Sequence, residues 1–256
     1  MIVLMTGAAG GIGRATASAL AAKGHRLALI DRDAESLATT LDGLRVAGAV
    51  VEAEAADVRD RDGVQLAIGA LEERLGPTEL LVACAGVGGI SSATDLDTAG
   101  LRAMLEINVL GVAHAIEAVL PGMFRRGTGH IVGISSVAGF RGLPWMPGYS
   151  ASKAAISTYL EGLRPALKRR GVTITTVCPG FVRTPMTSGT PFRKPIPMME
   201  PDAAARSIVR AIERRPREYV FPIGTALAMG LLRRLPNRAF DWMMDQAGPK
   251  ALTTEF

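Results

Sequence analysis

The sequence predicts an α/β fold in which helices cover both faces of one parallel sheet. Short apolar runs alternate with helical stretches from the first residues onward. These runs are nearly continuous, as expected for strands that are buried on both faces. Regular alternation of strand and helix is typical of a doubly wound sheet. The 256 residues fit a single domain, 1–256, that is long enough to bury a large core.

Each element has its own signal along the chain. Strands are predicted where the apolar runs lie, at 2–5, 26–30, 50–56, 79–84, 129–134, 172–177 and 218–221. Helices are predicted between them, at 14–23, 34–46, 60–75, 101–126, 147–170 and 202–214. Gly24 and Gly171 end two of these helices, because glycine adopts the conformation that closes a helix. Asp33 can cap the N-terminus of the second helix.

A glycine-rich turn follows the first predicted strand. The run T-G-A-A-G-G-I-G begins at Thr6 and joins a buried strand to an Ala-rich helix, the context in which such a motif is credible. Gly7 allows a tight turn, Gly11 lets a pyrophosphate approach the backbone, and Gly13 lets the helix pack against the strand. The free N–H groups of the helix N-terminus can then bind phosphates, so a Rossmann-like dinucleotide site is predicted. A purely structural turn is the alternative.

Tyr149 and Lys153 lie four residues apart in the run Y-S-A-S-K. On a helix this spacing places both side chains on one face, one turn apart. A neighbouring ammonium group favours the phenolate and lowers the pKa of a tyrosine from its usual value of about 10. The pair can therefore act as a general acid and base on a hydroxyl or carbonyl group.

Together the two motifs resemble those of the short-chain dehydrogenase/reductase family, whose fingerprint is T-G-x-x-x-G-x-G near the start and Y-x-x-x-K beyond the middle. The match continues between and after them, to about Thr184. Asn108 in I-N-V-L-G resembles the catalytic asparagine of the family, and Ser136, thirteen residues before the tyrosine, resembles its catalytic serine. One departure is A-C-A-G at 83–86, where Cys84 replaces an asparagine that usually ties neighbouring strands together.

The resemblance implies a role for each matching residue. Tyr149 takes or returns the proton of the substrate oxygen, while Lys153 lowers the pKa of Tyr149 and holds the nicotinamide ribose. Ser136 donates a hydrogen bond to the substrate oxygen, and Asn108 orders a water that links Lys153 to solvent. The implied cofactor residues are Thr6, Gly7, Gly11, Ile12, Gly13, Asp31, Arg32, Asp57, Val58, Ala85, Gly86, Tyr149, Lys153, Pro179, Gly180, Val182 and Thr184. The expected substrate pocket is mostly apolar and consists of Ser136, Phe140, Leu143, Trp145, Met146 and Tyr149.

The residues after the second and third strands bear on the choice of cofactor. The Asp31 carboxylate can accept hydrogen bonds from both ribose hydroxyls and would repel a 2′-phosphate, which favours NAD. Arg32 could bind that phosphate, so NADP stays open. Gly10 favours NAD, because NADP-preferring relatives often carry a basic residue at that position. Asp57 matches the adenine-pocket aspartate of the family, and a helix cap is its alternative interpretation.

Two segments near the C-terminus differ from the strand and helix pattern. Residues 187–201 are rich in Pro, Met, Thr and Ser, and we interpret them as a lid over the substrate site, with an ordinary surface loop as the alternative. Residues 225–246 combine Leu, Met, Phe and Trp with three arginines, which predicts a helical C-terminal extension. The extension is expected to close a substrate pocket or contact a subunit, and peripheral membrane contact is the alternative.

Composition argues against several other classes of function. The formal charge of +5 and the pI of 9.6 permit weak attraction to anions, but the arginines are spread over helices, which disfavours nucleic-acid binding. Cys84 and Cys178 fall in apolar runs and are expected to be buried free thiols. The three histidines are scattered, so no metal site is expected. We recognise neither a signal peptide nor a membrane-spanning run and expect a cytoplasmic protein.

The expected function is that of an NAD(P)-dependent oxidoreductase that moves a hydride between a nicotinamide cofactor and an apolar secondary alcohol or ketone. The alternatives are an NADP-dependent carbonyl or ketoacyl reductase and a non-catalytic dinucleotide-binding sensor or scaffold. A homodimer, or a homotetramer built from such dimers, is expected because the corresponding helices of relatives pair across a two-fold axis. In this chain the helices at 101–126 and 147–170 offer Ile116, Val119, Leu120, Ile156, Tyr159, Leu160 and Leu163 at helical spacing.

Overall fold

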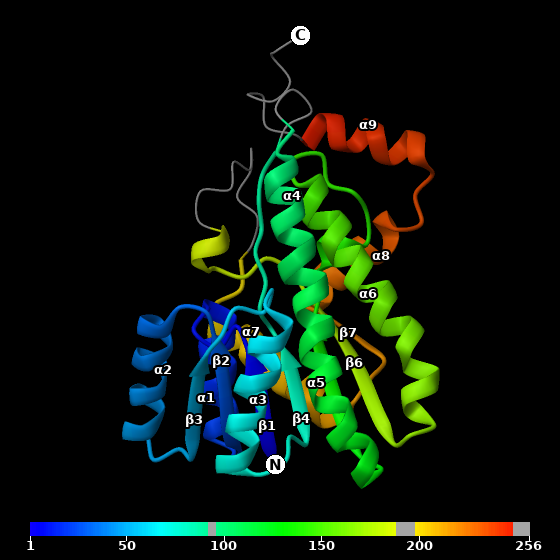
Figure 1. Ribbon diagram of the computed structural model, residues 1–256. Helices are drawn as coiled ribbons and strands as arrows, with labels where there is room; N and C mark the ends of the chain where they lie inside the picture. Colours follow the sequence, from blue (N-terminus) through cyan, green and yellow to red (C-terminus); the bar gives the residue numbers. More distant parts are fainter. Residues whose placement is uncertain (92–95, 188–197, 248–256) are drawn as a thin grey trace.

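The structure is a computed structural model that describes residues 1–91, 96–187 and 198–247 (Figure 1). The described strands form one seven-stranded sheet in the order β3-β2-β1-β4-β5-β6-β7, and neighbouring strands are parallel. They are β1 (Ile2–Thr6), β2 (Arg26–Asp31), β3 (Val51–Ala55), β4 (Leu80–Ala83), β5 (Gly129–Ile134), β6 (Val172–Pro179) and β7 (Glu218–Phe221). The predicted single-domain, Rossmann-like doubly wound sheet is confirmed.

Helices cover both faces of the sheet and enclose two apolar cores. One core contains residues of α3 (Arg61–Leu75), α5 (Gly111–Arg126) and α6 (Pro147–Lys168), and the other contains residues of α1 (Gly11–Ala21), α2 (Ala34–Val46) and α7 (Pro201–Arg214). Successive residues of a strand serve the two cores in turn, so that Leu4 belongs to the first and its neighbours Val3 and Met5 to the second. This double burial explains why the strands are continuous apolar runs.

The predicted helix ends agree with the structure in most places. Asp33 caps α2 by accepting a hydrogen bond from the Ser36 backbone N–H. Gly24 and Gly171 have φ of +77° and +76° where the preceding helices have ended. The cap of α3 is Asp60, which accepts from the Gly63 N–H, so the alternative interpretation of Asp57 as a helix cap is wrong.

The helix predicted at 101–126 is interrupted near its middle. α4 (Thr98–Leu105) runs into a π-helical turn at Glu106–Leu110, which continues as α5. The wider turn places Asn108 inside the protein, where it is fully buried. Among the described residues, only the stretch Thr98–Arg126 is long and apolar enough to cross a membrane, and 44% of its apolar window is buried inside the fold.

The C-terminal extension is helical, as predicted, but consists of two helices. α8 (Ile223–Leu232) and α9 (Asn237–Ala247) are separated by a short segment that contains Pro236. Proline lacks the N–H that a continuous helix would use, which explains the break. α8 contains no buried residue, whereas Phe240 of α9 is only 6% exposed. In Figure 1, α9 lies across the end of the molecule toward which the strands run.

The helical residues expected to contact a second subunit are largely used inside the chain. Those at most 1% exposed are Ile116, Val119, Ile156 and Leu160, and all belong to the core on one face of the sheet. The expectation that they are surplus to that core is therefore wrong, because the sheet itself covers them. The exposed large apolar side chains of the stretch 98–126 and of α6 are Leu105 at 38%, Leu110 at 51%, Phe124 at 36% and Tyr159 at 41%.

Candidate active site

A cavity of about 1210 Å³ opens at the carboxyl ends of the strands. It begins where β1 and β4 are neighbours, the point at which the strand order reverses and at which open α/β sheets bind ligands. The cavity extends from the glycine turn to Tyr149. Of the predicted site residues it is lined by Gly7, Gly11, Ile12, Gly13, Asp31, Arg32, Asp57, Val58, Ala85, Gly86, Ser136, Leu143, Trp145, Met146, Tyr149, Lys153, Pro179, Gly180, Val182 and Thr184.

The glycine turn leaves a close-fitting space beside the backbone, the glycine cradle, that side chains would occupy. Gly7 has φ of +69°, and a Cβ there would lie 2.6 Å from the Ala85 backbone. A Cβ on Gly13 would lie 2.0 Å from the Gly7 carbonyl oxygen, and one on Gly11 would lie 2.9 Å from the Thr184 Cγ2. The N-terminus of α1 follows directly and has no side-chain cap. Its free N–H groups and the close backbone fit the pyrophosphate of a dinucleotide.

Asp31 lies at the end of β2 with its carboxylate held in place from two sides. It accepts hydrogen bonds from the Ala9 N–H at 2.9 Å and from the Asp33 N–H at 3.2 Å. Arg32 lines the cavity beside it. The predicted residue Thr6 does not line the cavity, and its hydroxyl accepts a hydrogen bond from the Ala85 N–H at 3.4 Å. Thr6 therefore ties β1 to the turn after β4, close to the position where Cys84 replaces the family asparagine.

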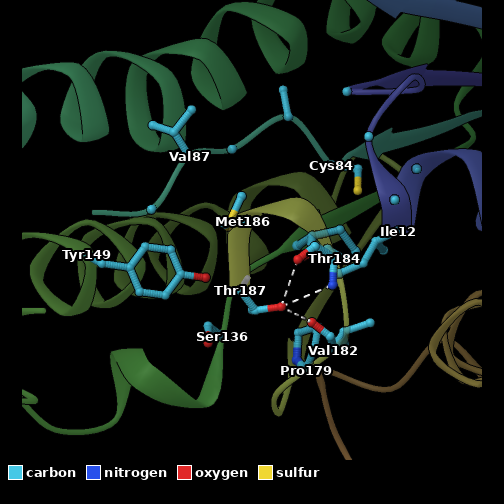
Figure 2. Close-up of a pocket in the computed structure, with 18 of the residues that line it drawn as sticks. Ile12, Cys84, Val87, Ser136, Tyr149, Pro179, Val182, Thr184, Met186 and Thr187 are labelled. Atoms are coloured by element: carbon cyan, nitrogen blue, oxygen red, sulfur yellow. Dashed lines mark hydrogen bonds between the residues drawn. The ribbon is translucent and has the colours of Figure 1, made fainter. Parts of the chain in front are cut away.

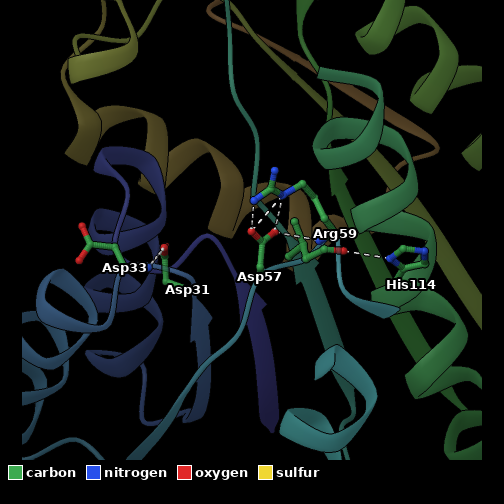
Figure 3. A network of polar contacts seen from close by, with 6 residues as sticks. Asp31, Asp33, Asp57, Arg59 and His114 are labelled. Atoms are coloured by element: carbon green, nitrogen blue, oxygen red, sulfur yellow. Dashed lines mark hydrogen bonds and ion pairs between the residues drawn. The ribbon is translucent and has the colours of Figure 1, made fainter. Parts of the chain in front are cut away.

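A polar network holds the turn after β3 (Figure 3). The Asp57 carboxylate accepts hydrogen bonds from the Arg59 guanidinium, which also holds the pKa of that carboxyl below its usual value. The Val58 carbonyl lies 2.9 Å from the His114 Nδ1 of α5. The turn is therefore fixed at Asp57 and Val58, two of the predicted cofactor residues.

Tyr149 and Ser136 meet at the other end of the cavity, and Figure 2 shows the Tyr149 hydroxyl with Ser136 beside it. Burial raises the pKa of Tyr149, and a hydrogen bond with Ser136 offsets part of that effect. The neighbouring Ser135 points elsewhere, because its hydroxyl donates to the Lys153 carbonyl at 2.9 Å. Of the two serines that follow β5, Ser136 is thus the one hydrogen-bonded to Tyr149, and its contact with a substrate stays a prediction.

Lys153 is buried one helical turn after Tyr149. Its Nζ donates to the Ile134 carbonyl at 3.0 Å, and burial lowers its pKa to about 8. The ammonium group lies 5.7 Å from the centre of the Tyr149 ring. Burial of the phenol, not this ammonium, is the largest influence on the pKa of Tyr149, so the expected lowering is not found in the structure.

Asn108 connects the π-helical turn to the turn after β4. Its amide donates to the Val87 carbonyl and to the Ser152 hydroxyl, both at 2.9 Å, and its Oδ1 accepts from the Val87 N–H at 2.8 Å. Both N–H donors of the side chain are therefore used to fix the wall of the cavity. The water-ordering role of Asn108 stays a prediction.

The family model for short chain dehydrogenases matches residues 1–193 of this chain. The chain belongs to the short-chain dehydrogenase/reductase family. Two curated relatives are similar to this chain. An uncharacterized oxidoreductase of Myxococcus xanthus is 40% identical over 238 residues, which cover 93% of this chain and 94% of the relative. The ketoacyl reductase HetN of Nostoc sp. is 31% identical over 221 residues, which cover 85% of this chain and 77% of the relative.

Solved structures of the short-chain dehydrogenase/reductase family share the whole architecture. One from Burkholderia phymatum, in complex with NAD, has a TM-score of 0.83 at 29% identity and covers 97% of this chain and 95% of its own. A variant of the actinorhodin polyketide ketoreductase with NADPH has a TM-score of 0.80 at 30% identity and covers 87% of this chain and 95% of its own. The chain is therefore an oxidoreductase of this family with a nicotinamide cofactor.

The end of the cavity beside Tyr149 has a larger apolar wall than the predicted residues alone would form. Leu143, Trp145 and Met146 line the cavity, but Phe140 does not, because its ring lies under the Arg233 guanidinium at 5.5 Å. Its assignment to the pocket is therefore wrong. Three methionines from distant segments, Met186, Met229 and Met244, complete the wall instead. Most of the lid predicted at 187–201 lies outside the described residues.

Several residues that line the cavity were not predicted from the sequence. Arg14 follows the glycine turn, and Ser36 lies in the first turn of α2. Their side-chain directions could have been derived from the helix period. No signal in the sequence could have placed Met229 and Met244, because their approach depends on how α8 and α9 fold back. Cys84 also lines the cavity, and burial raises the pKa of its thiol to about 11, which makes it a poor nucleophile.

Proposed function

We propose that the chain interconverts an apolar secondary alcohol and the corresponding ketone, with Tyr149 as general acid and base and with NAD preferred over NADP. The observation that carries the proposal is the cavity itself. One end is a glycine cradle for a dinucleotide, and the other end joins a buried phenol to an apolar wall.

The chemistry divides between the cofactor and the chain. A nicotinamide, when bound, supplies the exchange of a hydride with the substrate carbon. Tyr149 gives a proton to the substrate oxygen during reduction or takes it during oxidation. Ser136 donates a hydrogen bond to the same oxygen as charge develops on it. Lys153, the only ammonium this close to the phenol among the residues that line the cavity, holds the ribose.

The substrate class follows from the wall beside Tyr149. Leu143, Trp145 and Met146 come from the segment before α6. Met244 packs against them, and Met186 and Met229 line the same cavity. Such a wall favours a carbonyl compound with an apolar chain or ring, because burial of apolar area supplies the binding energy.

The cofactor preference follows from Asp31. Two backbone N–H groups fix its carboxylate at the end of β2, in the position to accept hydrogen bonds from a ribose. A 2′-phosphate would meet that fixed negative charge. Arg32 and Arg14 line the same part of the cavity, and they are the observation that favours the second candidate, an NADP-dependent carbonyl or ketoacyl reductase. The relative named as a ketoacyl reductase and the neighbour solved with NADPH also support this candidate.

A substrate screen with both cofactors tests the proposal. Aliphatic and aromatic ketones of increasing size, β-ketoacyl thioesters, and the corresponding alcohols are offered with NAD(H) and NADP(H), and kcat/KM is measured for each pair. The proposal expects turnover of simple apolar ketones with NADH as the better cofactor. Selective turnover of β-ketoacyl thioesters with NADPH would favour the second candidate. Tight cofactor binding without any turnover would favour the non-catalytic sensor.

A further inference from the structure

Two reciprocal contacts between an arginine and an aromatic ring join the segment before α6 to the C-terminal helices. The Arg141 guanidinium lies 4.1 Å from the centre of the Phe240 ring, and the Arg233 guanidinium lies 5.5 Å from the centre of the Phe140 ring. The neighbouring residues Phe140 and Arg141 thus contact the two ends of the connection between α8 and α9: Phe140 contacts Arg233 after α8, and Arg141 contacts Phe240 in α9. Such cation–π contacts are favourable and depend on the orientation of the guanidinium.

Arg141 also makes two hydrogen bonds to the same connection. Its Nη1 donates to the Leu235 carbonyl at 3.1 Å, and its Nη2 donates to the Asn237 Oδ1 at 3.2 Å. The Arg141 side chain therefore contacts Leu235 in the connection after α8, and both Asn237 and the Phe240 ring in α9. The planar guanidinium suits this task, because it can stack on a ring and donate at its edge.

Few other contacts hold the C-terminal helices in place. α8 contains no buried residue, and of the α9 side chains described, Phe240 is the one that is buried. Helices of this length are marginal without tertiary contacts, so their position depends strongly on the few contacts that exist. A second anchor lies at the start of α8, where a Cβ on Gly180 would be 3.1 Å from the Thr225 Cγ2.

The position of these helices decides the shape of the cavity beside Tyr149. Met229 of α8 and Met244 of α9 both line the cavity. Met244 and Tyr149 both pack against the apolar cluster that contains Leu143, Trp145 and Met146. Displacing α9 would therefore open the apolar wall at the reacting end, while the glycine cradle at the other end would stay intact.

We propose that Arg141 is a positioning residue that determines substrate specificity by clamping α9 over the reacting end of the cavity. It does not line the cavity itself and acts through Met244. The clamp makes the site select carbonyl compounds whose apolar part is large enough to reach this wall. The proposal rests on the proposed function for its substrate class, whereas the clamping contact can be tested without turnover.

The experiment compares Arg141→Gln with Arg234→Gln. Arg234 is an exposed arginine of the same connection, so the control removes the same charge without touching the clamp. Amide hydrogen exchange is measured over 237–247 in both variants and in the parent. Arg141→Gln is expected to exchange there at least about fivefold faster, as the loss of these contacts requires, with no change in α1 or α3. Phe240→Leu is expected to act in the same direction, because it retains the apolar bulk but removes the ring.

The second readout is kcat/KM for a series of methyl ketones with increasing chain length. In the parent, kcat/KM should rise with each added methylene that reaches the wall, and Arg141→Gln should reduce the preference for long over short ketones by about tenfold. The KM for the cofactor should not change, and Arg141→Lys should restore part of the preference. Met244→Ala should reduce the rise of kcat/KM with ketone chain length without increasing the rate of amide hydrogen exchange in α9.

The outcomes separate the two proposals. Parent-like exchange over 237–247 and a parent-like length preference in Arg141→Gln would overturn the clamp. Faster exchange with an unchanged length preference would show that the clamp is structural only and would overturn its role in specificity. A parent that turns over no ketone would overturn the proposed function and the specificity role with it, and the exchange data would still decide whether Arg141 holds α9.

Discussion

The Lys153 ammonium lies 5.7 Å from the centre of the Tyr149 ring, and its hydrogen bond goes to the Ile134 carbonyl at 3.0 Å. A cation is thus held inside the protein by a main-chain oxygen, and burial lowers its pKa to about 8. Keeping a charge in such a place opposes folding. The structure therefore predicts a measurable conflict between the site and the stability of the fold.

Replacing the buried ammonium should stabilise the protein. We expect Lys153→Met to raise the free energy of unfolding at pH 7 by about 1–2 kcal/mol, after allowance for the lost hydrogen bond to Ile134. Chemical denaturation measures this change, and Lys168→Met, at an exposed position of the same helix, is the control. A destabilised Lys153→Met variant would contradict the prediction.

The increase in the free energy of unfolding caused by Lys153→Met should become smaller at alkaline pH. The pKa of Lys153 falls from 10.5 in the unfolded chain to about 8 in the folded protein, so between these values the unfolded state binds more protons. Titration of Lys153 therefore makes the free energy of unfolding of the parent rise with pH between about 8 and 10.5. Lys153→Met lacks the titrating group and should show no such rise. Denaturation curves from neutral pH to above pH 10 should show the two proteins converging, and a constant difference would contradict the assigned pKa.

The glycine cradle offers a matched pair of substitutions. Gly13→Ala should destabilise the protein by about 2–4 kcal/mol, because the new Cβ cannot avoid a carbonyl oxygen of the same turn without backbone movement. Gly10→Ala should change stability by less than about 1 kcal/mol, since its Cβ would lie at an ordinary 3.5 Å from the Gly7 oxygen. Equal effects of the two substitutions, measured by thermal unfolding, would show that the turn is less closely packed than described.

Asp31 should control the choice of cofactor. We expect the parent to have a kcat/KM with NAD at least about tenfold above that with NADP, and Asp31→Ala to narrow or reverse this ratio. The carboxylate is fixed by two backbone N–H groups, so its removal changes charge at one defined position. Asp33→Ala, which removes the cap of α2 next to it, is the control for a local loss of structure. A parent that prefers NADP would show that Arg32 or Arg14 dominates.

Assembly into a dimer, or into a tetramer of dimers, stays a prediction. The side chains available for a two-fold contact are the exposed large apolar ones of the stretch 98–126 and of α6, namely Leu105, Leu110, Phe124 and Tyr159. Light scattering at micromolar concentration should give at least twice the monomer mass, and Tyr159→Arg should reduce it. A monomer with full activity would exclude a functional requirement for assembly.

The parts of the fold that were predictable share one property: their signals are local. The apolar runs placed β5 and β7 without error, and Asp33 and Gly24 marked helix ends through their own chemistry. The π-helical turn around Asn108 was not predictable, because its sequence reads as an ordinary amphipathic helix. The hydrogen bonds that its amide donates to Val87 and Ser152 join segments distant in the sequence.

The candidate site also has a part that local sequence signals predict and a part that depends on long-range folding. The cofactor cradle and the Tyr149 to Lys153 spacing follow from short motifs, whereas the substrate wall depends on long-range folding. Phe140 was misplaced because a loop has no period from which to derive a side-chain direction. Met244 was missed because its place in the wall depends on how α9 folds back over the cavity.

The central claim is that Tyr149 is the acid and base of a nicotinamide-dependent reaction, and one measurement tests it most directly. Turnover of the best ketone from the substrate screen is compared between the parent, Tyr149→Phe and Tyr159→Phe, a control on the same helix. We expect Tyr149→Phe to lower kcat by at least about a hundredfold with nearly unchanged cofactor affinity, because only the phenolic proton is lost. Activity of Tyr149→Phe within about tenfold of the parent would contradict the account.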